Sequence, residues 1–169
     1  GLDLAAASDS GSSSSDNITN STTLQISGSA EETSTVQILI GGVASGSTCT
    51  TTGGVFTCTT GTLTAGTKTV TATAQDAAGN TSSASTPLTV TIDLTNPSVE
   101  TITSTTAAGS YRTGQSIAIR VVMSETVTAG AALVLTFNTN ETATVTAASN
   151  GNLLTGTYVI GSGINTSAL

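Results

Sequence analysis

The sequence predicts an all-β protein built from antiparallel β-sandwiches, and three observations support this class. Apolar residues alternate with threonine in short runs such as 69–74 and 88–93, as in strands with one buried and one solvated face. Threonine supplies 38 of the 169 residues, and its β-branched side chain suits a pleated surface. No stretch of ten or more residues follows a 3.6-residue period, so we expect no long helix.

Residues 1–94 contain about seven strand-like runs, which is enough for one complete sandwich. Clusters of Gly, Asn, Asp and Ser separate the runs and favour turns between antiparallel strands. The apolar side of each run should face the interior of the sandwich. We therefore expect a first core that contains Leu24, Ile26, Val36, Ile38, Val70, Ala72, Leu88, Val90 and Ile92.

A domain boundary is expected at residues 95–97, directly after a strand-like run. Pro97 is one of only two prolines, and the residue before a proline is held extended, which suits a short, stiff linker. Residues 98–169 contain about five strand-like runs, near 99–103, 116–123, 132–137, 142–147 and 153–160. This length is short for a sandwich, so we expect the second domain to be incomplete.

The two cysteines flank a hairpin-like segment with Gly53-Gly54 at its centre. Two glycines favour a type I′ turn, which requires positive φ at both positions. Centring the turn there pairs Cys49 with Cys58 as a non-hydrogen-bonded pair, with Cα atoms about 4.5 Å apart. That separation is within disulfide range, so we expect a cross-strand disulfide and an oxidising, extracellular setting. Two reduced structural thiols are the alternative.

Several segments of residues 2–93 resemble the sequence of a known repeat family, and one of them is Asp76-Ala77-Ala78-Gly79-Asn80. The others are 2–4, 8–11, 16–19, 26–31, 65–72 and 90–93. Through them the first half resembles the bacterial Ig-like repeats of large secreted adhesins and other cell-surface proteins. Residues 99–169 resemble a second repeat type of the same proteins, through 109–117, 123–127 and 133–137. The resemblance implies two tandem Ig-like antiparallel β-sandwich domains, the second missing its last strands. The cysteine hairpin departs from these repeats, which usually lack cysteine.

Acidic residues fall mainly in loops, where they are candidate metal ligands. Asp9 and Asp16 share one loop with Asn17, and Asp93 ends the last strand of the first domain. In an Ig-like topology these two places share one pole, next to the linker. Three further candidates, Glu31, Asp76 and Asn80, lie in loops expected at the opposite pole. Similar repeats bind calcium at domain junctions, and calcium takes 6–8 oxygen ligands. The alternative at both poles is solvated turn residues that bond their own backbone.

Composition excludes several function classes. The chain has no His, so it has no His-based acid–base chemistry and no Ser-His-Asp triad. Only three residues are basic and the formal net charge is −7, which argues against nucleic-acid binding. No run approaches the roughly 20 apolar residues of a membrane-spanning helix. A glycosidase carboxylate pair is disfavoured because no aromatic sugar platform accompanies the few scattered acids. We therefore expect no enzyme.

The leading hypothesis is a non-catalytic structural segment of an extracellular surface protein, such as a stalk, fibre or adhesin repeat. Its expected partners are neighbouring Ig-like domains or copies of itself, with a host-surface or glycan ligand as a further candidate. One alternative is a self-assembling filament subunit, and another is an accessory module of a secreted enzyme.

The filament alternative rests on strand donation between neighbours. An incomplete second domain would leave the inward faces of Ile117, Ile119, Val121, Leu133 and Leu135 without cover. The first 20 residues of another copy are the expected donor, because Leu2-Asp3-Leu4 alternates and a serine-rich stretch follows it.

Overall fold

A computed structural model describes residues 1–11 and 13–162 of the chain. Two compact units divide the chain, Gly1–Leu94 and Thr95–Leu169. All regular secondary structure in the described residues is β, which confirms the predicted fold class. Each unit has a hydrophobic core of its own.

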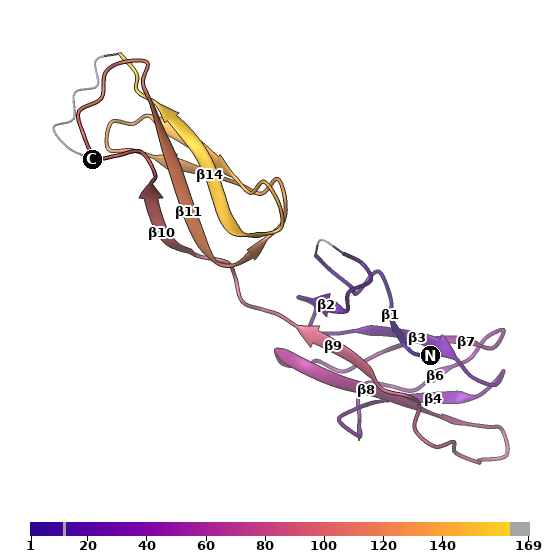
Figure 1. Ribbon diagram of the computed structural model, residues 1–169. Coiled ribbons are helices and arrows are strands. Elements are labelled where there is room, and N and C mark those ends of the chain that lie inside the picture. The colour runs from indigo at the N-terminus through magenta and orange to yellow at the C-terminus, as the bar shows by residue number, and fades with distance from the viewer. Residues whose placement is uncertain (12, 163–169) are drawn as a thin grey trace. The chain divides into compact units, whose positions relative to one another are not determined.

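The first unit is a sandwich of two sheets (Figure 1). One sheet has the order β1 (Asp3–Leu4), β3 (Gln25–Ser29) and β7 (Val55–Thr59). The other has the order β2 (Ile18–Thr19), β9 (Leu88–Ile92), β8 (Gly66–Gln75), β4 (Thr35–Ile40) and β5 (Val43–Ala44), and β6 (Cys49–Thr50) also pairs with β4. The pairs are antiparallel except β2 with β9, which is parallel. This topology matches an Ig-like sandwich.

The core of the first unit follows the predicted alternation closely. Eight of the nine expected core residues are buried, and Leu88 is half-buried against the same cluster. The core also takes in Leu4, Phe56 and Cys58. Gly28 lies under Phe56 and Leu2, because a Cβ there would come within 2.7 Å of the Phe56 ring. The small residue thus lets two apolar side chains lie across β3.

The carboxyl-terminal half of β8 lies beside an irregular segment, residues 81–86, instead of beside a strand. Ser82 and Ser85 accept hydrogen bonds from the backbone N–H groups of Ala74 (3.0 Å) and Ala72 (3.1 Å) through their hydroxyls. Their own N–H groups donate back to the carbonyls of the same two alanines. The serine side chains therefore replace the carbonyls of a regular ladder and keep the β8 edge satisfied.

The second unit contains one hydrogen-bonded sheet with the order β10 (Val99–Ser104), β11 (Ser116–Val127), β14 (Gly151–Val159), β13 (Thr142–Thr146) and β12 (Ala132–Thr136). Figure 1 shows β11 and β14 side by side, and their pairing extends over most of β14. By contrast, β13 pairs with β14 only at Val145–Gly156 and Thr146–Thr155. The sheet therefore folds over at this crossing, and β12 and β13 contribute to the core opposite β11.

The predicted loss of cover is wrong for three of the five residues. Ile117, Ile119 and Val121 are buried because Ala143 and Val145 of β13 pack in the same cluster, while Leu133 and Leu135 are half-buried. What stays uncovered is β10, where every residue is exposed, including Ile102 at 56%. Within residues 95–162, the unit thus has a core, and its edge strand β10 is exposed.

The amino-terminal segment, which was expected to donate a strand to a neighbouring copy, pairs within its own unit. Leu4 is buried in the first core, and Asp3 and Leu4 pair with Ser27 and Ile26 of β3. In this structure the segment therefore forms the edge strand of its own sandwich, and it would have to leave that place to donate a strand to a neighbouring copy.

Candidate functional site

The predicted disulfide is present, with the Cα atoms of Cys49 and Cys58 5.4 Å apart. The turn is also present, since Gly53 and Gly54 have φ of 63° and 77° and Thr52 pairs with Val55. The predicted ladder beyond that pair is wrong. Cys49 pairs with Val36 of β4, whereas Cys58 pairs with Ile26 of β3. The disulfide therefore joins the two sheets rather than two strands of one hairpin.

Thr51 explains why the hairpin splits. Its side chain is buried, and its hydroxyl donates to the carbonyl of Glu31 (2.6 Å) while accepting from the N–H of Ser34 (2.9 Å). This corner fixes β6 beside β4. Gly46 lies across the end of β7, where a Cβ would be 2.1 Å from the carbonyl oxygen of Thr59. Segment 45–52 thus closes one side of the sandwich.

The first predicted metal pole is centred on Asp9. Asp9 is only 4% exposed, and its Oδ2 accepts from the N–H of Asn17 (3.2 Å). Its Oδ1 is buried without a hydrogen-bond partner in the described structure, as is the Oδ1 of Asn17. Asn17 has a φ of 60°, a conformation that asparagine tolerates better than most residues. Two buried oxygens with unused lone pairs therefore belong to the same loop.

The loop and the end of β9 lie at the same pole, as expected for an Ig-like topology. Thr91 donates its N–H to the carbonyl of Asn17, and Asp93 donates its N–H to the carbonyl of Thr19, both at 2.9 Å. Asp16 instead accepts from the N–H of Ile18 (3.1 Å), in a local turn. Over residues 1–11 and 13–162, no three His, Cys, Asp or Glu side chains gather closely enough to hold a metal ion.

A groove of about 470 Å³ lies at the second predicted pole. Glu31, Asp76 and Asn80 all contribute to its lining. Leu2 directly precedes β1, and Phe56 belongs to β7 of the same sheet. The other sheet contributes Val36, Ala72 and Ala74, and the irregular segment beside β8 contributes Ser82, Ser83 and Ser85. The groove is thus the side of the sandwich between β1 and segment 81–86.

Asp76 is held in a closed turn at the end of β8. Its Oδ1 accepts from the N–H groups of Ala78 (2.9 Å) and Asn80 (2.8 Å), and its Oδ2 accepts from the Asn80 side chain (2.9 Å). These bonds, led by the one from the Asn80 side chain, lower the pKa of Asp76 below its usual 3.8. The carboxylate is therefore charged at neutral pH.

Asn17 is a site residue that the sequence alone did not single out as a ligand. Its signal was weak, since an asparagine beside an acidic residue in a serine-rich loop reads as an ordinary turn.

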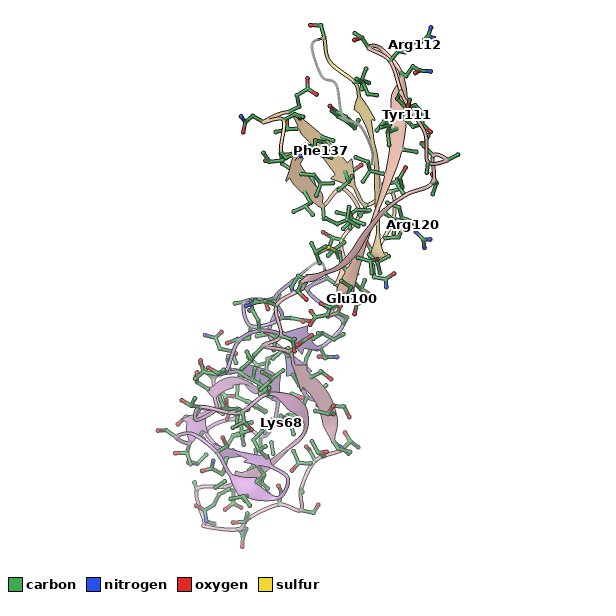
Figure 2. All side chains as sticks on the ribbon, turned by 90° about the vertical axis from the view of Figure 1, so that its left-hand side faces the viewer. Lys68, Glu100, Tyr111, Arg112, Arg120 and Phe137 are labelled. Carbon is green, nitrogen blue, oxygen red and sulfur yellow. A yellow bond between two sulfur atoms is a disulfide. The ribbon has the colours of Figure 1, made fainter. Side chains whose placement is uncertain are left out.

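In the second unit, Tyr158 donates a hydrogen bond to Glu141, and this bond raises the pKa of the tyrosine. Figure 2 shows Arg120 extending outward from β11 and Arg112 extending outward from the loop before β11.

The two poles offer oxygen atoms, hydroxyls and an apolar groove, and neither offers, among the described residues, a nucleophile paired with a base. The part of the chain that the structure describes has no helix that could cross a membrane.

A family profile described as bacterial Ig-like domain matches residues 1–94, which is more than half of the chain. A search of curated proteins found no match. Residues 95–169 lie outside the family match, so their resemblance to a second repeat type stays a prediction. Given the two-sheet topology of the matched unit and the extent of the match, the chain belongs to the bacterial Ig-like domain family.

Proposed function

We propose that this chain is a non-catalytic structural segment of an extracellular surface protein, acting as part of a stalk, fibre or adhesin. The family match over residues 1–94 carries the proposal, because bacterial Ig-like domains are generally structural modules and are typical of surface proteins. The disulfide between the two sheets is compatible with an oxidising, extracellular location. Ig-like domains commonly interact with neighbouring domains, which makes such domains or further copies the proposed partners.

Surface labelling of the source cells tests this proposal. Antibodies raised against residues 1–94 should label intact cells, and brief external protease treatment should remove the signal. Labelling that appears only after the cells are permeabilised would contradict an extracellular role. A catalytic domain in the same polypeptide would instead favour the accessory-module alternative.

The assembly state of the purified chain distinguishes a filament subunit from a stalk module. Light scattering of the purified chain at rising concentration should report a monomer if the segment is a stalk module. Concentration-dependent polymers that persist after residues 1–8 are deleted would favour assembly through another edge, with the exposed β10 as the first candidate.

A second proposal concerns calcium at the first pole, bound at Asp9 and Asn17. The predicted ligands Asp16 and Asp93 belong to the same pole, although the described structure does not gather three carboxylates there. Carboxylate and amide oxygens suit calcium, and the buried Oδ1 atoms of Asp9 and Asn17 have no hydrogen-bond partner in the described structure. An ion there would tie the first loop to the end of β9. Calcium at the second pole is less favoured, because both oxygens of Asp76 already accept hydrogen bonds.

Calorimetric titration with calcium tests the metal proposal, together with thermal unfolding. Calcium should raise the unfolding temperature of the first unit, because only the folded chain gathers the ligands. Asp9→Asn should remove this increase, whereas Asp3→Asn, an equal charge change at an exposed position on β1, should retain it. Absence of binding at millimolar calcium would overturn the proposal.

A further inference from the structure

The groove of the first unit has an apolar floor and a polar rim. Val36, Phe56 and Ala72 form buried parts of its lining, and each belongs to a strand of one of the two sheets. The rim carries the exposed carboxylate of Glu31 and the half-buried Asp76, together with serine hydroxyls. Ser82 and Ser85 fix one wall, because their hydroxyls are bonded to the β8 backbone. The two sheets and the serine segment beside β8 thus enclose the groove.

The charge around this groove is uncompensated. Its lining contains no Lys, Arg or His, and neither Glu31 nor Asp76 forms an ion pair in the described structure. Seven acidic residues and one lysine give residues 1–94 a formal charge of −6. The lysine, Lys68, bonds Thr64 and the carbonyl of Ala65 near the opposite end of β8, about 26 Å along the strand from Asp76. A positively charged group of another molecule would therefore not compete with a Lys or Arg side chain of this unit for the groove.

We propose that the groove binds the side chain of a lysine or arginine carried on an extended segment of a partner protein. The aliphatic stem of such a side chain can lie on the apolar floor while its charged head reaches the rim, the usual division for these residues. Glu31 offers an exposed carboxylate at the rim, and Asp76 adds a fixed negative charge. This inference goes beyond the proposed structural role, because it gives the surface a partner of defined chemistry.

The same features disfavour a metal ion in this groove. Calcium needs 6–8 oxygen ligands, whereas Asp76 is committed to three N–H donors in its turn. A cationic side chain needs only proximity to the carboxylates and acceptors for its N–H groups, which the serine hydroxyls provide.

A matched pair of short peptides tests the proposal in solution. The probe is acetyl-Thr-Lys-Thr-amide, and its control replaces lysine with norleucine, which keeps the stem and removes the charge. Amide chemical shifts of the full chain should move around Glu31, Ala74 and Ser83 with the lysine peptide and not with the norleucine peptide. Glu31→Gln should weaken binding about threefold, in line with the small energies of exposed ion pairs.

Glu32→Gln is the control variant, since Glu32 is the next residue, is exposed and lies outside the groove lining. It makes the same charge change and should leave affinity unchanged. Equal weakening by the two variants, or shifts spread over all acidic loops, would show only nonspecific attraction and overturn the proposal. Full competition by millimolar calcium, with the same residues shifted, would also overturn it in favour of a metal site. None of these outcomes bears on cell-surface labelling, so the structural role is tested separately.

Discussion

Gly46 combines two restrictions that other glycines of the first unit do not share. It has a φ of 74°, and a Cβ there would lie 2.1 Å from the Thr59 carbonyl oxygen. Gly46→Ala should therefore cost about 2–4 kcal/mol of stability, from backbone strain and a clash that no side-chain movement relieves. Urea unfolding followed by circular dichroism measures this loss.

Gly42→Ala provides the matched control. Gly42 also has a positive φ, 85°, but no atom lies within 4 Å of the place that a Cβ would take there. Only the conformational cost of about 1–2 kcal/mol should remain. Equal losses for the two variants would show that the close approach of segment 45–52 to β7 contributes nothing.

Asp76 should make the first unit sensitive to acid. Because its pKa is lowered in the folded chain, its contribution to stability is present above the usual value of 3.8 and is lost as pH falls through the lower folded value. Thermal unfolding between pH 5 and about pH 2 measures this loss. Asp76→Asn should reduce the acid-induced drop in unfolding temperature, while Asp3→Asn serves as a charge-matched variant outside the turn. An unchanged acid dependence in Asp76→Asn would refute the role of the turn.

At the scale of elements, alternation was sufficient to predict the long strands. Val70 and Ala72 of β8 and Ile119 and Val121 of β11 are buried as their period requires. All five expected runs of the second unit became strands. Alternation states which face of a strand is buried, and burial dominates the free energy of a strand in a sandwich.

The strand partners were harder to predict, because pairing depends on distant contacts. The segment around Cys49 reads as one arm of a hairpin, yet the bonds of Thr51 to Glu31 and Ser34 place it beside β4. Likewise, the two metal poles were expected from loop order alone. The buried oxygens of Asp9 and Asn17 depend on the path of the loop, which no local pattern encodes.

Gly156 should control how the second sheet folds over. A Cβ there would lie 2.3 Å from the Thr144 carbonyl oxygen, at the point where β13 meets β14. Gly156→Ala should cost about 2–3 kcal/mol and open the Val145–Gly156 pairing. Tyrosine fluorescence reports this unit alone, since Tyr111 and Tyr158 are the only tyrosines of the chain.

Hydrogen exchange at Val145 and Thr155 gives a second readout of the same crossing, and exchange should quicken there. Gly109→Ala is the control, because nothing lies within 4 Å of a Cβ at that position. If Gly156→Ala leaves both stability and exchange unchanged, then the two-pair crossing does not hold β13 in place.

At the scale of the whole molecule, charge and chemistry are unevenly divided. The first unit carries a formal charge of −6 and both cysteines, whereas the second carries −1 and both arginines. Each unit has a separate core, so we expect two unfolding transitions, of which only one depends on reductant. A single transition by circular dichroism and tyrosine fluorescence would show that the two units unfold together.

The disulfide between the sheets has a consequence for a chain under tension. Cys49 and Cys58 are nine positions apart, so an intact bond keeps the residues between them out of the path along which a pulled chain lengthens. At about 3.4 Å per residue, stretching the unfolded first unit should yield roughly 25 Å less extension when the bond is intact than after reduction. Optical-tweezer traces with and without a dithiol would measure the difference, and identical extensions would show that the bond does not shorten the chain. Once tension has unfolded the first unit, its extended length would then depend on the redox state of its surroundings.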